Sequence, residues 1–128
     1  MLPSVGEWGL YPWFEERGRS LVHPQDADAF SSLLPYGKLF QCVAWDNQYM
    51  TLRYGNRQFR VRPDLFAAVT APPFDFGQTV AFGKGGRAVS GTVVDICWHH
   101  GRDRPFFHLR LNGKRLKKRY WAEDLVGP

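Results

Sequence analysis

The stretch CWHHGRD, residues 97–103, places a thiol, two adjacent imidazoles and a carboxylate within seven positions. Side chains of these types bind zinc. Because alternate residues of a strand share a face, Asp95, Cys97 and His99 would form a three-ligand set. A tetrahedral site needs a further ligand, and the chain has no Cys-x-x-Cys or His-x₃-His spacing to supply one. The alternative is a core Cys97 followed by a polar loop, so we expect no metal and no cofactor.

A catalytic interpretation of the same stretch lacks its supporting parts. A nucleophilic Cys97 needs a base within hydrogen-bond reach, which His99 or His108 could supply, and a third group that orients the base. No nucleophile elbow adjoins it. The Gly-rich GKGGR at 83–87 lacks the spacing of a phosphate-binding loop and is typical of a tight hairpin turn. We therefore expect a protein that is not an enzyme and has no catalytic residues.

Basic and apolar residues alternate in two segments, RQFRVR (57–62) and KRLKKRYW (114–121). As strands, the first would present Arg60 and Arg62 on one face, and the second would present Arg115, Lys117 and Arg119 on one face. The second would thereby continue a cationic sheet surface across the turn from Arg110. The alternative is a solvated face whose cations guard a sheet edge. The predicted binding residues are the cations of these faces and of the flanking loop, with Trp121: Arg60, Arg62, His99, His100, Arg102, Arg110, Arg115, Lys117, Arg119 and Trp121.

The net charge of +5 lies entirely in the second half of the chain. Residues 1–72 hold seven Lys/Arg and seven Asp/Glu, whereas residues 73–128 hold ten and five. A concentrated positive field favours an acidic partner. Trp and Arg are typical of protein interfaces, and aromatic-basic faces also bind nucleic acid. We expect a non-catalytic module that binds an acidic protein partner, with nucleic-acid binding by the same face as the alternative.

Short strands are the elements that position these residues. A helix is predicted over Pro24–Leu34, where Pro24 suits the first turn and apolar residues recur at helical spacing. Beyond it, the hydrophobic pattern has period two. TAPPFDFG (70–77) predicts a linker, and Asn112-Gly113 predicts a hairpin turn. The predicted strands cover residues 38–45, 49–54, 57–62, 78–82, 88–99, 105–111 and 114–121.

The two halves follow a similar plan. In 52–66 and in 109–126, Leu-Arg leads to a Gly/Asn turn, a basic strand and a short segment with Asp-Leu. We expect a mainly β fold with a short N-terminal helix and small SH3-like or Tudor-like barrels, two in tandem packed together. The expected parts are an N-terminal aromatic turn and helix packing on the body (1–37), a first small barrel or half-barrel (38–72) and a second, basic SH3-like barrel (73–128).

The stretch GTVVDICWHHGRDRPFFHLRLNGKRLKKRYWAEDL, residues 91–125, resembles a group of small bacterial proteins. The shared pattern is a Val-rich strand, Asp-Ile-x-Trp-His-His, Arg-Pro-aromatic, Asn-Gly-Lys and Arg-Tyr-Trp-x-Glu-Asp-Leu. The resemblance implies an SH3-like barrel in a bacterial cytoplasmic protein, and it brings no catalytic residues. Small bacterial proteins of this size are often immunity proteins, so a toxin is one expected acidic partner.

Two cysteines, Cys42 and Cys97, each lie in an apolar, strand-like run. The start of the chain lacks the pattern of a signal peptide, and no apolar run is long enough to span a membrane. Lone thiols in such a chain indicate reduced core residues in the cytoplasm, with no membrane partner. A disulfide between them and the oligomeric state stay open from sequence.

Overall fold

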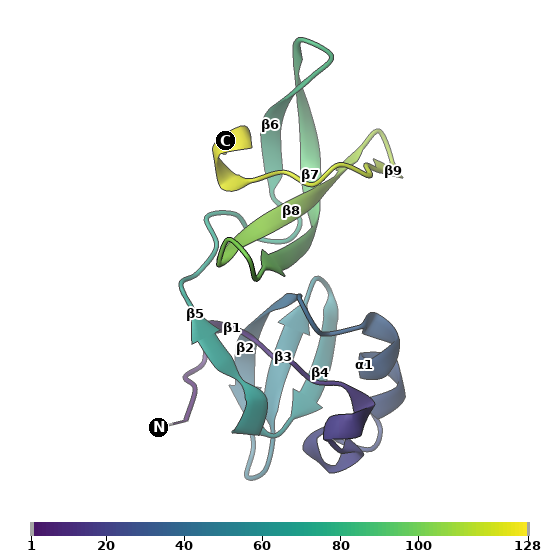
Figure 1. The fold of residues 1–128 in the computed structure, drawn as a ribbon, viewed down its shortest axis with the longest axis vertical. Coiled ribbons are helices and arrows are strands. Elements are labelled where there is room, and N and C mark those ends of the chain that lie inside the picture. Colours follow the sequence, from purple (N-terminus) through teal and green to yellow (C-terminus); the bar gives the residue numbers. More distant parts are fainter. Residues whose placement is uncertain (1, 128) are drawn as a thin grey trace. The chain divides into compact units, whose positions relative to one another are not determined.

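The computed structural model describes residues 2–127 and divides the chain into two compact units, Met1–Ala71 and Pro72–Pro128. Each unit has its own antiparallel sheet, so the prediction of a mainly β fold with one short α-helix is confirmed (Figure 1). The strand order of both sheets is open rather than closed into a barrel, as far as the described strands go. No helix within residues 2–127 is long and apolar enough to cross a membrane.

The first unit is a five-stranded sheet in the order β4-β3-β2-β1-β5. Its strands are β1 (Trp8–Leu10), β2 (Leu39–Trp45), β3 (Met50–Tyr54), β4 (Arg57–Val61) and β5 (Ala67–Val69). The 3₁₀ helices Glu15–Arg17 and Arg19–Leu21 and the helix α1 (Ala27–Leu33) connect β1 to β2. A further 3₁₀ helix, Pro63–Leu65, turns the chain after β4 and leads into β5, which pairs with β1.

Phe30 of α1 is the centre of the first core. Its ring lies 5.1–5.8 Å, between centroids, from the rings of Tyr11, Trp13, Phe40 and Phe59. All five side chains are at most 2% exposed. Because these rings come from both ends of the unit's sequence, one residue joins α1 to the sheet and to the N-terminal region.

The N-terminal region contributes a strand, which the sequence pattern did not predict. Trp8–Leu10 forms β1 between β2 and β5, where a turn was expected. An added Cβ at Gly9 would lie only 2.4 Å from Cζ of Phe66, so glycine lets this ring cover the strand. A three-residue strand with a central glycine carries too little alternation to be recognised.

The helix is shorter than the predicted Pro24–Leu34. It covers Ala27–Leu33, and Leu34, expected on its apolar stripe, adopts a left-handed φ of +60° and is 71% exposed. The residue before a proline is disfavoured in the helical region, and Pro35 follows directly. The helix therefore ends one residue early and turns Leu34 out of the core.

The second unit is a four-stranded sheet in the order β6-β7-β8-β9. Its strands are β6 (Thr79–Lys84), β7 (Arg87–His99), β8 (Arg104–Leu111) and β9 (Lys114–Arg115), and a 3₁₀ helix covers Ala122–Asp124. Bridges link Tyr120 to Phe107 of β8 and Val126 to Ala81 of β6. The segment after β9 thus reaches both β8 and β6. A hairpin, a 3₁₀ helix and a return to the unit's first strand therefore recur in both units.

A β-bulge in β7 keeps the second core continuous. Val93 pairs with Leu109, and Ile96 pairs with Phe107, with the register shift lying between Val93 and Asp95. The four paired apolar side chains are at most 1% exposed. Without the extra residue, Val93 and Ile96 would point to opposite faces, so the bulge restores the inward direction.

Glycines serve two purposes in this unit. Asn112 and Gly113 have φ values of +52° and +77°, so the predicted hairpin turn between β8 and β9 is confirmed. The bulge of β7 lies between Val93 and Asp95 and not at Gly91. An added Cβ there would lie 2.8 Å from the carbonyl oxygen of Arg110 and 3.0 Å from the Phe82 ring, so glycine permits a close approach instead.

The predicted strand over 114–121 is wrong beyond Arg115. The Leu116 amide donates to the Leu109 carbonyl, and Tyr120 next pairs with Phe107. More residues therefore separate the paired positions on this segment than on β8, and the surplus loops out of the sheet. Arg115, Lys117 and Arg119 consequently do not form one strand face.

Both cysteines are free thiols. Cys42 is fully buried in β2, as predicted, and its burial raises the pKa of the thiol. The predicted core position is wrong for Cys97, which is only partly buried and lies opposite Phe106 in the sheet. Its neighbour Ile96 takes the inward position instead, because the bulge sets the direction of every later residue of β7.

Candidate functional site

The outer face of β7 and β8 carries side chains of mixed chemistry. Cross-strand pairs join His99 to Arg104, Cys97 to Phe106 and Asp95 to His108, whereas the alternate residues Ile96 and Phe107 are fully buried in the core. The predicted common face of Asp95, Cys97 and His99 therefore exists. However, no group of three or more His, Cys, Asp or Glu side chains within residues 2–127 is arranged to hold a metal ion.

Trp121 is the centre of a cluster at one end of this face. Its ring centroid lies 5.5 Å from that of His99 and 5.9 Å from that of Phe106, both in edge-to-face geometry. Three guanidinium carbons lie 4.3–5.4 Å from the Trp121 ring centroid, within the range of cation–π attraction. We call this set the Trp121 cluster: His99, Arg102, Arg104, Phe106, Arg119 and Trp121.

Backbone contacts hold Trp121 in place. Tyr120, 4% exposed, exchanges two backbone hydrogen bonds of 2.8 Å with Phe107. The Trp121 amide donates to Oδ2 of Asp124 at 2.9 Å, and the Asp124 amide donates to the Trp121 carbonyl at 3.0 Å. These reciprocal bonds cap the 3₁₀ helix Ala122–Asp124. The ring position is thus fixed by pairing on one side and by a cap on the other.

The loop between β7 and β8 brings Arg102 over the Trp121 ring. Asp103 adopts a φ of +54°, and its amide donates to the His99 carbonyl at 2.7 Å. The Arg102 amide donates to Nδ1 of His99 at 3.0 Å. An added Cβ at Gly101 would lie 3.1 Å from Cε1 of His99, so glycine lets the loop fold tightly on the imidazole. The predicted residue His100 is exposed in this loop.

Three carboxylates near the cluster, those of Asp95, Glu123 and Asp124, are bonded within the unit. Arg104 binds Glu123 at 2.6 Å, and this hydrogen bond holds the pKa of the Glu123 carboxyl below its usual value. Arg115 binds Asp95 at 2.9 Å. Asp124 accepts the Trp121 amide, as described. Within residues 2–127, Arg102 and Arg119 make no ion pair, and neither does Arg110. Their charges remain available to a ligand.

A second cationic feature of this unit lies where β6 turns into β7. A hollow of about 350 Å³ is bounded by the Gly-rich hairpin and by the looped-out segment after β9. Gly85 and Gly86, with φ values of +60° and +77°, make the predicted tight turn. The ammonium of Lys118 lies 5.1 Å from the Tyr120 ring centroid. We call this the lysine hollow, and its lining residues include Lys84, Lys117 and Lys118 but no carboxylate.

The predicted residues of the first unit have structural partners. Arg60 donates from Nε to Oδ2 of Asp26 at 2.8 Å and from Nη2 to Oδ1 at 3.0 Å. This bonding lowers the pKa of the Asp26 carboxyl. Arg62 donates to the Ser20 carbonyl at 3.1 Å, and its guanidinium lies 5.3 Å from the Tyr49 ring centroid. These arginines connect β4 to the segment around α1 and belong to a different unit from the Trp121 cluster.

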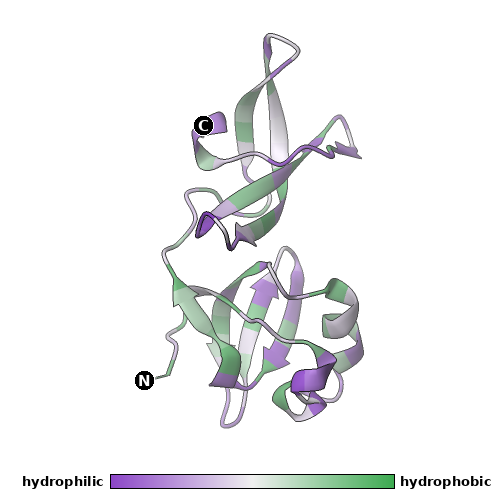
Figure 2. Ribbon diagram, viewed as in Figure 1, coloured by the Kyte–Doolittle hydropathy of each residue, from purple (hydrophilic) through white to green (hydrophobic). Residues whose placement is uncertain are grey.

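Sequence reasoning missed four members of these sites. Phe106 and Arg104 belong to the Trp121 cluster, and Lys84 and Lys118 belong to the lysine hollow. Strand alternation could have found the first two, because an inward Phe107 places Phe106 and Arg104 together on the outer face. No comparable signal exists for Lys84, which meets Lys117 only through the folding of a loop (Figure 2 shows the segment around β9 as hydrophilic).

Comparisons with known proteins place the chain at the level of a family. No curated protein and no solved structure matches it. One family match extends over nearly the whole sequence and therefore includes both units and the Trp121 cluster. The chain belongs to the family of unknown function DUF6960, which matches residues 1–126.

Proposed function

We propose that this chain is a non-catalytic binding module whose second unit holds an acidic protein partner through the Trp121 cluster. One observation carries the proposal. Three guanidiniums converge on a single indole ring, and two of them, those of Arg102 and Arg119, make no ion pair within residues 2–127. A guanidinium stacked on a ring keeps its in-plane N–H donors for a carboxylate.

An acidic protein fits the Trp121 cluster better than a nucleobase does. Base stacking needs a free aromatic face, but guanidiniums lie over the Trp121 ring and would have to be displaced. Desolvated Trp and Arg side chains are the residues that dominate protein interfaces. The proposed role of Trp121 is to hold Arg102 and Arg119 in position, so that little side-chain entropy is lost on binding.

The order of elements supports a finer description of the fold. In both units a hairpin and a 3₁₀ helix precede a segment that returns to pair with the unit's first strand. We propose that the two units are small SH3-like barrels in tandem, a fold that hosts many binding functions. Together with the resemblance to small bacterial proteins, this supports an immunity-type protein that covers an acidic toxin surface in the bacterial cytoplasm.

Nucleic-acid binding is the second candidate function. The observation that favours it is the lysine hollow, where Lys84, Lys117 and Lys118 line about 350 Å³ without a carboxylate. Ammonium groups bind phosphates as point charges, and the affinity then depends strongly on salt. In this function the Trp121 cluster would flank a phosphate track.

Fluorescence anisotropy with labelled probes separates the two functions. The probes are an acidic peptide and DNA and RNA oligomers of equal charge, each titrated at two salt concentrations. The proposal expects tighter binding of the peptide, and a loss of about tenfold in Arg119→Ala. Arg57→Ala is the matched control, because Arg57 also lies over a ring, that of Phe59, but in the first unit.

Two results would decide against the acidic partner. Tighter binding of the oligomers, weakened by Lys117→Ala and by added salt, would establish the alternative. Binding of neither probe at low salt would reject both functions.

A further inference from the structure

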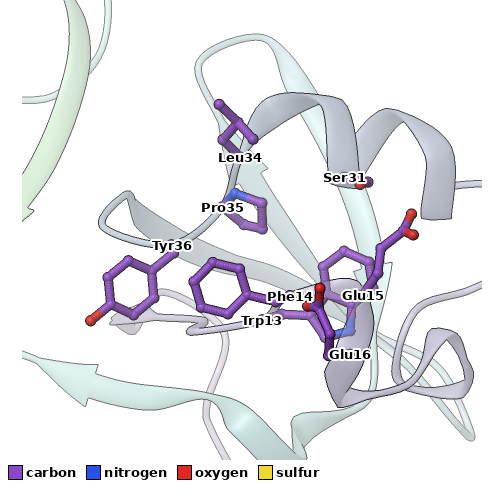
Figure 3. A pocket seen from close by; sticks show the side chains of 8 residues that line it. All are labelled: Trp13, Phe14, Glu15, Glu16, Ser31, Leu34, Pro35 and Tyr36. Atoms are coloured by element: carbon purple, nitrogen blue, oxygen red, sulfur yellow. The ribbon is translucent and has the colours of Figure 1, made fainter.

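A hollow on the first unit combines aromatic walls with carboxylates. It encloses about 280 Å³ and lies between the 3₁₀ helix Glu15–Arg17 and the end of α1 (Figure 3). Its lining residues include Trp13, Phe14, Glu15, Glu16, Leu34 and Tyr36. None of the predicted binding residues lies here, and the charge of the lining is opposite to that of the lysine hollow.

The hollow collects apolar side chains that the fold leaves in water. Phe14 is 51% exposed, Leu34 is 71% exposed and Tyr36 is 47% exposed. Only three other large apolar side chains within residues 2–127 are exposed to a similar extent, and none of them lines the hollow. Leu34 also holds a left-handed φ, which residues other than glycine rarely adopt. Clustered exposed apolar groups mark interaction sites.

The walls are fixed without a ligand. The rings of Phe14 and Tyr36 are stacked, with centroids 5.1 Å apart and an angle of 25° between their planes. Trp13 is 1% exposed, and its Nε1 donates to the Gly18 carbonyl at 3.1 Å. Figure 3 shows these two stacked rings on one side of the hollow and the carboxylates of Glu15 and Glu16 on the other.

The two carboxylates differ in their bonding. Glu15 binds Arg19 at 2.7 Å, so part of its charge is neutralised. Glu16 makes no ion pair within residues 2–127. An unneutralised carboxylate opposite aromatic rings attracts a cation, and the rings attract it further through their quadrupole. Apolar walls favour alkyl groups on that cation.

We propose that this hollow binds an alkylated organic cation, either a quaternary ammonium head group or the basic side chain of a protein segment. Shape supplies contact for the alkyl part, and Glu16 supplies the counter-charge. The same carboxylate repels anions such as phosphate. The inference stands apart from the proposed function, because it concerns another unit and a ligand of opposite charge.

NMR titration of the full chain with a matched pair of ligands tests the selectivity for charge. Choline and 3,3-dimethylbutan-1-ol have the same shape, but only choline is charged. The expected result is shifts at the amides of Phe14, Glu16 and Tyr36, with choline bound about tenfold tighter than the alcohol. Equal affinity for the two ligands, or no shift at these amides with choline, would overturn the proposal.

Variants separate charge from shape. Glu16→Gln is expected to weaken choline binding about threefold to tenfold and to leave binding of the alcohol unchanged. Glu7→Gln removes one negative charge from the same unit outside the hollow, and it should leave both affinities unchanged. Phe14→Ala should weaken the binding of both choline and the alcohol, because it removes one of the stacked rings. A loss of choline affinity as large in Glu7→Gln as in Glu16→Gln would contradict a local counter-charge.

A third arm distinguishes the two sources of the cation. Blocked tripeptides with central lysine, trimethyllysine or arginine are titrated beside choline. Tighter binding of a peptide than of choline assigns the hollow to a basic protein segment, and tighter binding of choline assigns it to a small quaternary ammonium compound. If neither the peptides nor choline change the chemical shifts of the Phe14, Glu16 and Tyr36 amides, the proposal is wrong.

Discussion

The two units share an order of elements but arrange their ring-stacked arginines differently. In the first unit, Arg57 lies over Phe59 and Arg62 over Tyr49, two separate rings. In the second unit, Arg102, Arg104 and Arg119 converge on the single ring of Trp121. Both units also bond arginines to carboxylates, for example Arg60 to Asp26 and Arg104 to Glu123. An arginine bonded to a carboxylate stabilises the fold with the donors that a ligand would need, whereas an arginine stacked on a ring keeps those donors.

The two units also differ in where their aromatic side chains lie. The first core is built around Phe30 and four further aromatic rings, all nearly fully buried. In the second unit, Phe106 and Trp121 stay on the outer face of the sheet, and Phe107 and Tyr120 point inward. The aromatic rings around Phe30 thus lie in the core, whereas the second sheet carries aromatic rings on both its inner and its outer face.

Phe30→Ala should have the largest effect on stability. Removing the central ring of the first core is expected to lower the free energy of unfolding by about 3–5 kcal/mol. Phe14→Ala deletes the same side chain from an exposed position in the same unit, and its cost should stay below about 1 kcal/mol. Chemical denaturation of both variants measures the contrast. Similar losses would show that α1 is not held by the aromatic core.

Gly9→Ala and Gly91→Ala test whether the two units depend on the same device. In each, a glycine in a strand lies beneath a ring, that of Phe66 or of Phe82, at distances too short for an added Cβ. Each variant is expected to lose about 1–3 kcal/mol of stability. Gly83→Ala, which meets nothing within 4 Å, should change it by less than about 0.5 kcal/mol. A loss of stability in only one of the two variants would show that the two units do not both depend on a glycine beneath a ring.

Asp26→Asn removes the carboxylate that pairs with Arg60, so that Arg60 loses its ion pair with residue 26. Because bonding to Arg60 lowers the pKa of Asp26 in the folded state, the carboxylate stabilises the fold above its unfolded pKa of about 3.9. That stabilisation is lost as the pH falls through the lower folded pKa. The variant is expected to be less stable by about 1–2 kcal/mol at pH 7, with the difference closing below about pH 4. A difference that is independent of pH would contradict this origin.

Arg115→Ala should have the smallest effect. Its partner Asp95 is 22% exposed, but the Arg115 side chain is 50% exposed, so the pair is screened by water. Thermal unfolding is expected to show a loss below about 1 kcal/mol, which shrinks further at high salt. A loss that exceeds that of Asp26→Asn would reverse the distinction between the two units' ion pairs.

Sequence patterns located most elements because local rules decide them. Asn112-Gly113 identified its hairpin, since both positions need positive φ. The period-two pattern predicted strands over 78–82, 88–99 and 105–111, where β6, β7 and β8 lie. The short strands β1 and β5 escaped notice because neither is long enough to show a period, and each forms only through pairing with the other and, for β1, with β2.

The candidate sites were less predictable, because loops assemble them. Trp121 and Arg119 were found as an aromatic and a cation on one presumed strand, but that strand ends at Arg115. The structure separates Lys117 from them and joins it to Lys84, which lies far away in the chain. Pairing of Tyr120 with Phe107 determines this arrangement, and no local sequence pattern predicts such a bridge.

The segment after β9 has a consequence for the timing of assembly. It carries Trp121 between two bridges, one at Tyr120 and one at Val126, and the second bridge joins it to β6 at the opposite end of the unit's sequence. During synthesis, β6, β7 and β8 therefore leave the ribosome before the ring that organises the arginines arrives. The Trp121 cluster therefore cannot form until the segment after β9 has been synthesised, so a chain that presents this cluster already holds every strand of the unit.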